Sequence, residues 1–209
     1  MIRRSLPPRF EDASMELLHP SFECVKEYLL DLRPRLKAGA GLFVSGPPGV
    51  GKTYAIAALT KAAVSGIEYM STEGKNEGKM VPLVLRDFLF ATGPSLFEQY
   101  ALPYDAGDKD RTTDLEAVNW LVINDLGKEF RGGAYAQQVP YKLGRLLRSR
   151  VEKRLTTHIT TNLLLRRDEE SQGMSIEEVY GDSIFSLLME ACPFRYEVKG
   201  PDRRHSKEE

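Results

Sequence analysis

Cysteine and histidine are scarce in this chain of 209 residues, which has two cysteines and three histidines. Cys24 and Cys192 form no C-x-x-C pair and show no zinc-binding spacing. This excludes a disulfide-stapled scaffold and argues against a cysteine-based metal site. We therefore expect both residues to be buried free thiols in a reducing compartment.

Excess charge of one sign and long apolar runs are also missing. The formal net charge is −1, so there is no global electrostatic reason for tight nucleic-acid binding, and any DNA contact must come from a local patch. No apolar run approaches the length of a membrane span, and the basic residues 1–8 lack the apolar core of a signal peptide. We expect a soluble, cytoplasmic protein without a membrane partner.

Apolar sequence is nevertheless abundant enough, at 42% of residues, for one substantial core. Short apolar runs typical of buried strands alternate with helical patterns, which predicts an α/β fold with a parallel sheet of five strands flanked by helices. In chain order, the predicted strands are Gly41–Ser45, Val81–Leu85, Trp120–Ile123, Thr157–Thr161 and Phe194–Val198.

Two segments between these strands have distinct patterns. Residues 143–155 carry leucines at helical spacing, with the basic Lys142, Arg145, Arg148 and Lys153 mostly on the other face. This predicts an amphipathic helix whose basic face is either a solvated surface or a contact for a phosphate backbone. Residues 102–116 contain proline, glycine and alternating charges, which predicts a mobile loop.

The most specific motif is G-x-x-x-x-G-K-[ST] at residues 46–53, between a predicted strand and a predicted helix. Its glycines let the backbone aim N–H groups at phosphate oxygens, and the helix presents its positive end to the same anion. Lys52 is expected to reach the β- and γ-phosphates, and the Thr53 hydroxyl to bind Mg²⁺. The predicted ligands are ATP or ADP with Mg²⁺, and the predicted binding residues are Gly46, Pro47, Pro48, Gly49, Val50, Gly51, Lys52, Thr53 and Tyr54.

Polar residues follow the third predicted strand, at the place where P-loop ATPases carry acidic residues. Asn124 can accept a hydrogen bond from a metal-bound water but removes a charge beside the cation, and Asp125 is the candidate general base. With Thr53 they form the predicted Mg²⁺ site. The alternative is a structural one, in which Asn124 and Asp125 cap the loop after the strand.

Asn162 follows the fourth predicted strand. Its amide is placed to hydrogen-bond the γ-phosphate or the lytic water, the position called sensor 1. A turn-forming asparagine would have the same pattern.

These motifs, in this order, resemble the DnaC/IstB-type AAA+ ATPases, which load replicative helicases or assist transposition. The resemblance runs through residues 8–14, 46–53, 126–129, 150, 160–163, 180–188 and 200–204. It implies a P-loop NTPase core of AAA+ type in which Asp125 is the catalytic acid, Asn162 is sensor 1, and Arg203 or Arg204 is the sensor 2 arginine. It also implies action on a replicative helicase, on another DNA-transaction protein or on single-stranded DNA.

The resemblance divides the chain into three parts: an N-terminal extension at residues 1–20, the AAA+ core at residues 21–200, and a C-terminal tail at residues 201–209 with the candidate sensor 2 arginines. Loaders carry a partner-binding domain before the motor, and here only residues 1–20 precede the match.

Two departures from the family pattern bear on catalysis. Leu187 stands where the family places an arginine that reaches the γ-phosphate of a neighbouring subunit, and Ser183 stands at another place that is often basic. A missing arginine finger costs several orders of magnitude in turnover where one is used. Together with Asn124, this predicts slow ATP hydrolysis and leaves open whether the protein is an ATPase enzyme at all.

The expected function is therefore that of an ATP-binding, helicase-loader-like factor of DNA replication. Three alternatives stay open: a transposition helper ATPase, a non-hydrolysing nucleotide-binding adaptor and a small-molecule P-loop kinase. Against the kinase, the Asp202–Arg204 cluster lies at the chain end and not in a mid-chain lid.

Overall fold

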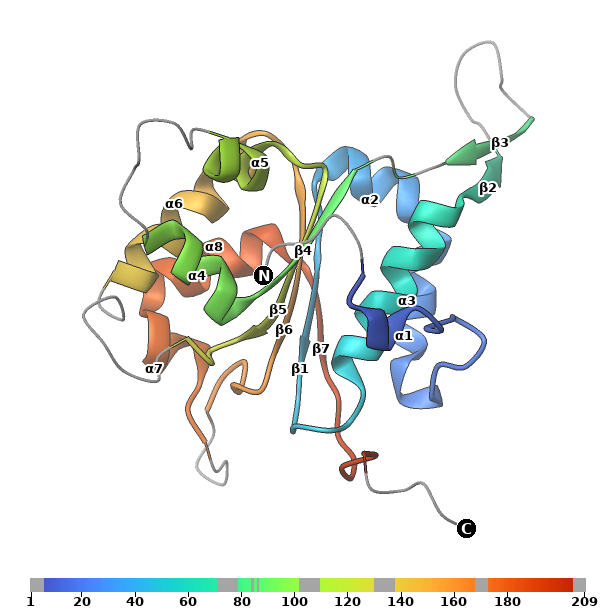
Figure 1. Ribbon diagram of the computed structural model, residues 1–209. Helices are drawn as coiled ribbons and strands as arrows, with labels where there is room; N and C mark the ends of the chain where they lie inside the picture. The colour runs from blue at the N-terminus through green and yellow to red at the C-terminus, as the bar shows by residue number, and fades with distance from the viewer. Residues whose placement is uncertain are drawn as a thin grey trace.

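A five-stranded parallel sheet lies between two layers of helices in the computed structural model, which describes residues 6–70, 79–83, 85, 87–101, 110–129, 138–167 and 173–204 (Figure 1). The strand order is β4-β5-β6-β1-β7, and every neighbouring pair is parallel. The strands are β1 (Leu42–Ser45), β4 (Phe88–Thr92), β5 (Trp120–Leu126), β6 (Thr156–Thr161) and β7 (Phe194–Glu197). The predicted α/β class and five-stranded parallel sheet are confirmed.

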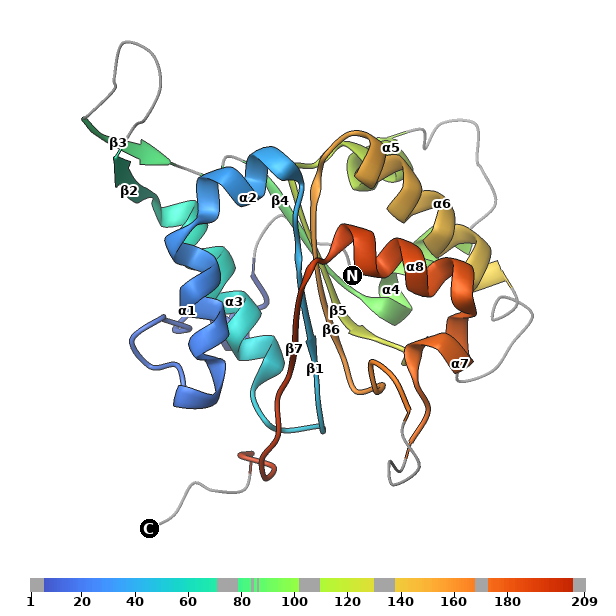
Figure 2. The same cartoon turned by 180° about the vertical axis from the view of Figure 1, so that it is seen from behind.

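The helices divide between the two faces of the sheet (Figures 1 and 2). One layer holds α1 (Glu23–Leu30), α2 (Leu32–Ala38) and α3 (Lys52–Ser65), preceded by the short 3-10 helices η1 (Pro8–Phe10) and η2 (Pro20–Phe22). The other layer holds α4 (Gly93–Ala101), α5 (Asp110–Ala117), α6 (Val139–Glu152), α7 (Ile176–Tyr180) and α8 (Asp182–Ala191). The helix predicted from the leucine spacing at residues 143–155 is α6, which begins earlier and ends at Glu152, so residues 153–155 lie outside it. The helix predicted after the P-loop is α3.

Alternation of side chains along the strands supplies both halves of the core. In β5, Leu121 and Ile123 belong to the cluster that packs under α4 to α8, whereas Trp120 and Val122 belong to the cluster under α1 to α3. All four side chains are fully buried. A central strand covered on both faces is apolar at successive positions, which is why the buried-strand pattern was readable in the sequence.

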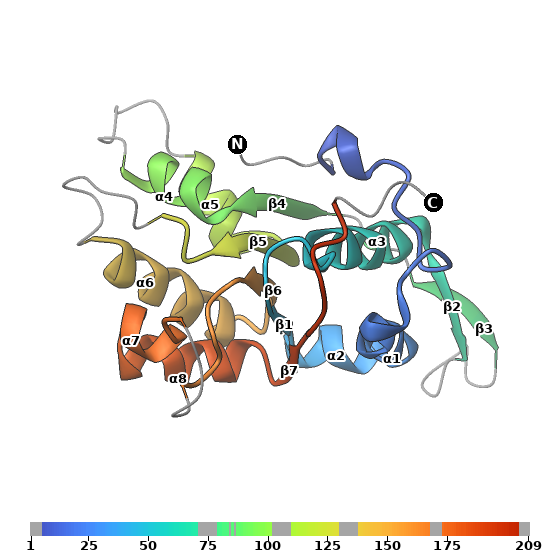
Figure 3. The ribbon, with the colours of Figure 1, turned by 90° about the horizontal axis from the view of Figure 1, so that it is seen from below.

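The second predicted strand is wrong as a member of the main sheet. Residues Met80–Leu83 form β3, which pairs antiparallel with β2 (Ile67–Met70) in a separate two-stranded ribbon. This ribbon projects beyond the far end of α3, away from the P-loop (Figure 3). The sheet position is taken by β4, whose Leu89, Phe90 and Ala91 are buried. Pro82 has no N–H group for a sheet ladder, which disfavours the predicted run in a main-sheet strand.

The predicted loop at residues 102–116 is wrong for residues 110–116, which lie in α5; residues 102–109 lie outside the described residues. Cys24 and Cys192 are both free and buried, as expected. Of the predicted C-terminal tail at residues 201–209, residues 205–209 also lie outside the described part. Within that part, none of the helices combines the length and apolarity needed to cross a membrane.

The first described residues pack on the α1 to α3 layer. Ala13 and Leu18 are buried in the same cluster as Phe22 and Tyr28. Residues 6–20 therefore pack on the residues of the predicted core, and the boundary at residue 20 stays a prediction.

Candidate nucleotide-binding site

The P-loop joins β1 to α3 at the carboxyl edge of the sheet. β1 lies between the parallel strands β6 and β7. Gly46, Gly49 and Gly51 all have positive φ, which glycine adopts without the strain that a Cβ would bring. The loop is also closely packed, because a Cβ at Gly46 would lie 2.2 Å from the carbonyl oxygen of Val198. Of the predicted binding residues, Pro48, Gly49, Gly51, Lys52, Thr53 and Tyr54 line a cavity.

Lys52 is folded back over its own loop. Its Nζ donates to the carbonyl oxygens of Gly46 at 2.7 Å and Pro47 at 2.6 Å, and to Asn162 Oδ1 at 2.8 Å. All three ammonium donors are therefore satisfied by protein. Burial lowers the pKa of Lys52 to about 8; Asp125 opposes this shift, whereas Lys128 and Arg204 add to it. Phosphate oxygens are acceptors that would favour the charged form more strongly than carbonyl groups.

The tip of β5 carries a bulge where it passes β6. Ile123 pairs with Ile159 but Leu126 pairs with Thr161, so one extra residue is accommodated on β5. Asp125 takes a left-handed conformation here, with φ 58°. Bulges beside functional sites re-aim side chains, and this one turns the Asp125 side chain toward the cavity that it lines.

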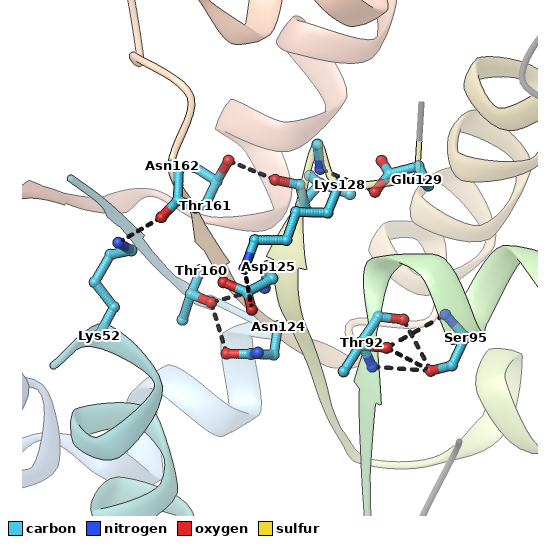
Figure 4. Close-up of polar contacts among 12 residues, drawn as sticks. Lys52, Thr92, Ser95, Asn124, Asp125, Lys128, Glu129, Thr160, Thr161 and Asn162 are labelled. Carbon is cyan, nitrogen blue, oxygen red and sulfur yellow. Dashed lines mark hydrogen bonds and ion pairs between the residues drawn. The ribbon is translucent and has the colours of Figure 1, made fainter. Parts of the chain in front are cut away.

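Thr160 fixes both predicted metal-site residues of the β5 tip. Its hydroxyl donates to Asn124 Oδ1 at 2.8 Å and accepts from the backbone N–H of Asp125 at 3.0 Å (Figure 4). Asn124 is buried and does not line the cavity, whereas Asp125 does. The Asp125 carboxylate forms an ion pair with Lys128, with 2.8 Å between Oδ2 and Nζ.

Asn162 follows β6 and faces Lys52, as the sensor 1 assignment requires (Figure 4). The neighbouring Thr161 holds the strand end in place, since its hydroxyl donates to the carbonyl oxygen of Leu126 at 2.6 Å and accepts from the N–H of Leu163 at 3.0 Å. The P-loop and the tips of β5 and β6 are thereby joined into one polar cluster.

The cavity that these residues line has a volume of about 630 Å³. This lies within the range of sites for small molecules and cofactors. Besides the P-loop and strand tips, its lining includes residues from the first described segment and from the end of the chain: Arg9, Phe10, Leu17, Leu18, His19, Phe22, Arg203 and Arg204. Apart from the two arginines, the sequence assigned no role to these residues.

Both candidate sensor 2 arginines reach the cavity by different routes. The N–H of Arg203 donates to the carbonyl oxygen of Gly49 at 3.1 Å, and its Nη2 lies 2.9 Å from His19 Nδ1 and 3.1 Å from Ser21 Oγ. Arg204 is paired with Asp202, with 2.6 Å between Nη2 and Oδ2. Arg203 therefore links the P-loop to the segment before α1.

Glu129 is a half-buried carboxyl group to which the sequence assigned no role. Its Oε2 accepts from the N–H of Gly127 at 2.9 Å, and its Oε1 accepts from the Tyr180 hydroxyl. Burial raises the pKa of Glu129 to about 7, against the opposing effect of backbone hydrogen bonds. The group lies beside the site, because Gly93 and the Asp125 carbonyl are close to it, but it does not line the cavity.

Metal binding here would depend on few protein groups. The described residues contain no cluster of three or more His, Cys, Asp or Glu side chains suited to a metal ion. Mg²⁺ in nucleotide sites uses one or two protein oxygens together with phosphates and water, so Thr53 and Asp125 at one cavity fit this cation. Leu187 in α8 packs partly buried against the core and does not line the cavity.

The P-loop lies between the central strand β1 and α3, polar residues end the neighbouring strands β6 and β5, and two arginines come from the end of the chain. This arrangement is the fold of P-loop NTPases of AAA+ type. No family model matches this chain, and no curated protein matches it by sequence. Among solved structures it is similar to the DnaC helicase loader, with a TM-score of 0.67, 22% identity, and coverage of 92% of this chain and 100% of the other.

Two further structures extend this likeness. For DnaI the TM-score is 0.63 at 22% identity, covering 95% of this chain and 94% of DnaI. For the replication initiator DnaA, bound to AMPPCP and single-stranded DNA, the TM-score is 0.56 at 12% identity, covering 91% of this chain and 51% of DnaA. This chain therefore has the fold of the DnaC helicase loader, which agrees with the fold that the resemblance of its motifs implies.

Proposed function

We propose that this chain binds ATP or ADP with Mg²⁺ and acts in DNA replication as a helicase-loader-like factor. The observation that carries the proposal is the convergence of Lys52, Thr53, Asp125 and Asn162 on one cavity, in the fold that this chain shares with a helicase loader. A glycine-rich turn with an incidental lysine would not account for an asparagine and an aspartate from two separate strands at the same loop.

The charges of the cavity suit a polyphosphate. Lys52, Lys128, Arg203 and Arg204 line it, whereas Asp125 is its one lining carboxylate among the described residues. In the proposed ATP complex, Lys52 exchanges its carbonyl acceptors for phosphate oxygens, and Thr53 and Asp125 hold Mg²⁺, which neutralises phosphate charge. Asn124 is buried and lies outside the lining of the cavity, so it supports this arrangement through its hydrogen bond with Thr160.

Replacement of Lys52 tests the nucleotide site. Lys52→Ala is expected to abolish binding of a fluorescent ATP analogue, measured by titration, because the ammonium is the central cation of the loop. Lys61→Ala is the matched control, since Lys61 lies on the same helix but bonds to the carbonyl of Glu11 away from the cavity. Unchanged affinity in Lys52→Ala would contradict the proposed site.

The proposed partner is a replicative helicase or another protein of DNA transactions, with single-stranded DNA as a further candidate ligand. Support comes from two of the similar proteins, one a helicase loader and one a replication initiator bound to single-stranded DNA. A pull-down from the native host with ATP, with ADP and without nucleotide tests this. Retention of a helicase only in the ATP arm supports the loader, and retention of a transposase or of no DNA-transaction protein contradicts it.

A non-hydrolysing adaptor is the second candidate, favoured by two observations. The candidate base Asp125 is paired with Lys128, and Leu187 is packed against the core instead of presenting a cation to a neighbour. Equal helicase binding in all three nucleotide conditions of the pull-down would select the adaptor.

A further inference from the structure

Lys128 occupies a place in the cavity for which neither the P-loop motif nor the strand-tip pattern has a use. It follows the bulge of β5, and its side chain folds back toward the tips of β5 and β6 (Figure 4). It lines the same cavity as Lys52, Thr53 and Asn162. A lysine side chain in a loop after a strand can extend into solvent. Because the Lys128 side chain lies at the cavity instead, we expect an attractive group there.

That group is Asp125. The two charged atoms are 2.8 Å apart, and the side chains of Lys128 and Asp125 remain 40% and 21% exposed. An ion pair this accessible is worth little as a stabilising contact, about 0–1 kcal/mol in general. It can therefore be exchanged for a better partner without loss of the fold.

We propose that Lys128 is a γ-phosphate ligand supplied by the chain itself, and that its pair with Asp125 is the resting contact that ATP displaces. The inference rests on the proposed function and goes beyond it by naming what distinguishes ATP from ADP. Asp125 is covered by Lys128 until a γ-phosphate draws the ammonium away, and the carboxylate is then free for Mg²⁺ or water. ADP lacks the group that makes this exchange, so it leaves the pair intact.

The position of Leu187 agrees with this assignment. No arginine stands at that place of α8 to complete a neighbour's site, and Leu187 packs instead against the core under α4 to α8. A cation within the same chain removes the need for one from a second subunit, as an arginine supplied in cis does in other nucleotide hydrolases.

The test compares the affinities of Lys128→Met for the non-hydrolysable analogue AMPPCP and for ADP, each measured by calorimetric titration. We expect AMPPCP binding to weaken about tenfold or more, the effect of losing one charge-assisted hydrogen bond, with ADP binding within about twofold of wild type. Lys128→Arg is expected to restore the AMPPCP affinity, because it keeps the cation at nearly the same reach.

Lys26→Met is a close structural match as a control. Lys26 pairs with Glu23 at the same i,i+3 spacing, with 3.1 Å between the charged atoms and 39% exposure of the lysine, and it does not line the cavity. It is expected to bind both nucleotides as the wild type does. Thermal unfolding of all three variants checks that each is folded.

The double variant Asp125→Asn with Lys128→Met distinguishes a direct contact between Lys128 and the γ-phosphate from an effect of the cavity's net charge. It removes one positive and one negative group, so the cavity keeps its wild-type net charge. Titration in EDTA removes the contribution of Asp125 to metal binding. If Lys128 contacts the γ-phosphate, the preference for AMPPCP over ADP stays reduced in the double variant. Recovery of the wild-type preference would show that Lys128 acts only through its charge, and would overturn the proposal.

The remaining outcomes are equally decisive. Equal weakening of AMPPCP and ADP in Lys128→Met, or no change in either, contradicts the γ-phosphate assignment while leaving the nucleotide site standing. A wild-type protein that binds neither nucleotide contradicts the proposed function as well.

Discussion

Thr160 is the residue through which the two tip positions of β5 are coupled. One hydroxyl donates to Asn124 and accepts from the backbone of Asp125, so the orientation of the candidate base depends on the group at position 124. An aspartate at that position would accept the same hydrogen bond and would restore the charge that the sequence lacks beside the cation.

Asn124→Asp is therefore expected to raise ATP turnover from a very slow wild-type rate by about tenfold or more, the scale of a transition-state electrostatic effect of about 1.4 kcal/mol. Steady-state phosphate release with Mg²⁺ measures it. Because the position is buried, thermal unfolding with Mg²⁺ checks that the new carboxylate is tolerated. The same change in a Lys52→Ala background is expected to show no turnover, which excludes a contaminating ATPase. Brisk wild-type turnover, or no rise in Asn124→Asp, would show that position 124 does not limit the rate.

Several residues of the site were predictable because the geometry of a parallel sheet fixes where they lie. In a parallel sheet the carboxyl ends of neighbouring strands meet at one edge, so a P-loop after one strand and polar residues after the next two must converge. Lys52, Asp125 and Asn162 do so. Phe10 and His19 were not predicted in this role. The resemblance includes residues 8–14 but gives them no place in the site, and no motif spacing ties the segment before α1 to the cavity.

At the scale of elements, Arg150 joins a helix end to a strand through carbonyl and hydroxyl acceptors. It is fully buried at the end of α6, and its guanidinium donates to the carbonyl oxygens of Leu115, Val118 and Thr156 and to the Thr157 hydroxyl. Leu115 and Val118 lie at the carboxyl end of α5, where the helix dipole favours a cation. Burial lowers the pKa of Arg150 to about 9.

Arg150→Met is expected to lower the free energy of unfolding by about 3 kcal/mol or more, because it strands several buried carbonyl groups at once. Urea denaturation followed by circular dichroism measures the change. Arg148→Met is the control on the same helix, where the arginine is exposed and the expected change is within about 0.5 kcal/mol. Equal effects of the two substitutions would show that Arg150 contributes only through general helix packing.

The second predicted strand, at residues 81–85, was wrongly placed in the main sheet because periodicity does not show which strands pair. Residues 81–85 and Phe88–Thr92 are both short apolar runs, and only one of them lies in the main sheet. The choice depends on which run pairs with β5, and this is a long-range contact that neither run encodes locally. The α6 helix was predictable because its spacing of leucines extends over several turns.

At the scale of the whole molecule, burial shifts the pKa values of two groups, the half-buried Glu129 and the fully buried His158, in opposite directions. Burial raises the pKa of Glu129 to about 7, above its ordinary 4.5, and lowers the pKa of His158 to about 3, below its ordinary 6.5. Between about pH 4.5 and 7 the folded state holds a proton on Glu129 that the unfolded state has released, so this group makes stability fall as pH rises. Between about pH 3 and 6.5 the unfolded state holds a proton on His158 that the folded state lacks, so stability rises with pH.

The two effects oppose each other between about pH 4.5 and 6.5, where they leave the wild-type stability only weakly dependent on these groups. Glu129→Gln removes the effect of the glutamate. The free energy of unfolding of this variant is therefore expected to rise more steeply with pH across this window, and to increase further relative to the wild type up to pH 8. Urea denaturation at pH 5, 6 and 8 measures the slope.

A glutamine also loses one acceptor for Tyr180 or Gly127, but that cost is the same at every pH and does not alter the slope. Glu177→Gln, at an exposed position of α7, is the control and is expected to leave the slope unchanged. Parallel curves for Glu129→Gln and wild type would mean that Glu129 is ionised in the folded protein throughout, with its Tyr180 and Gly127 hydrogen bonds outweighing its burial.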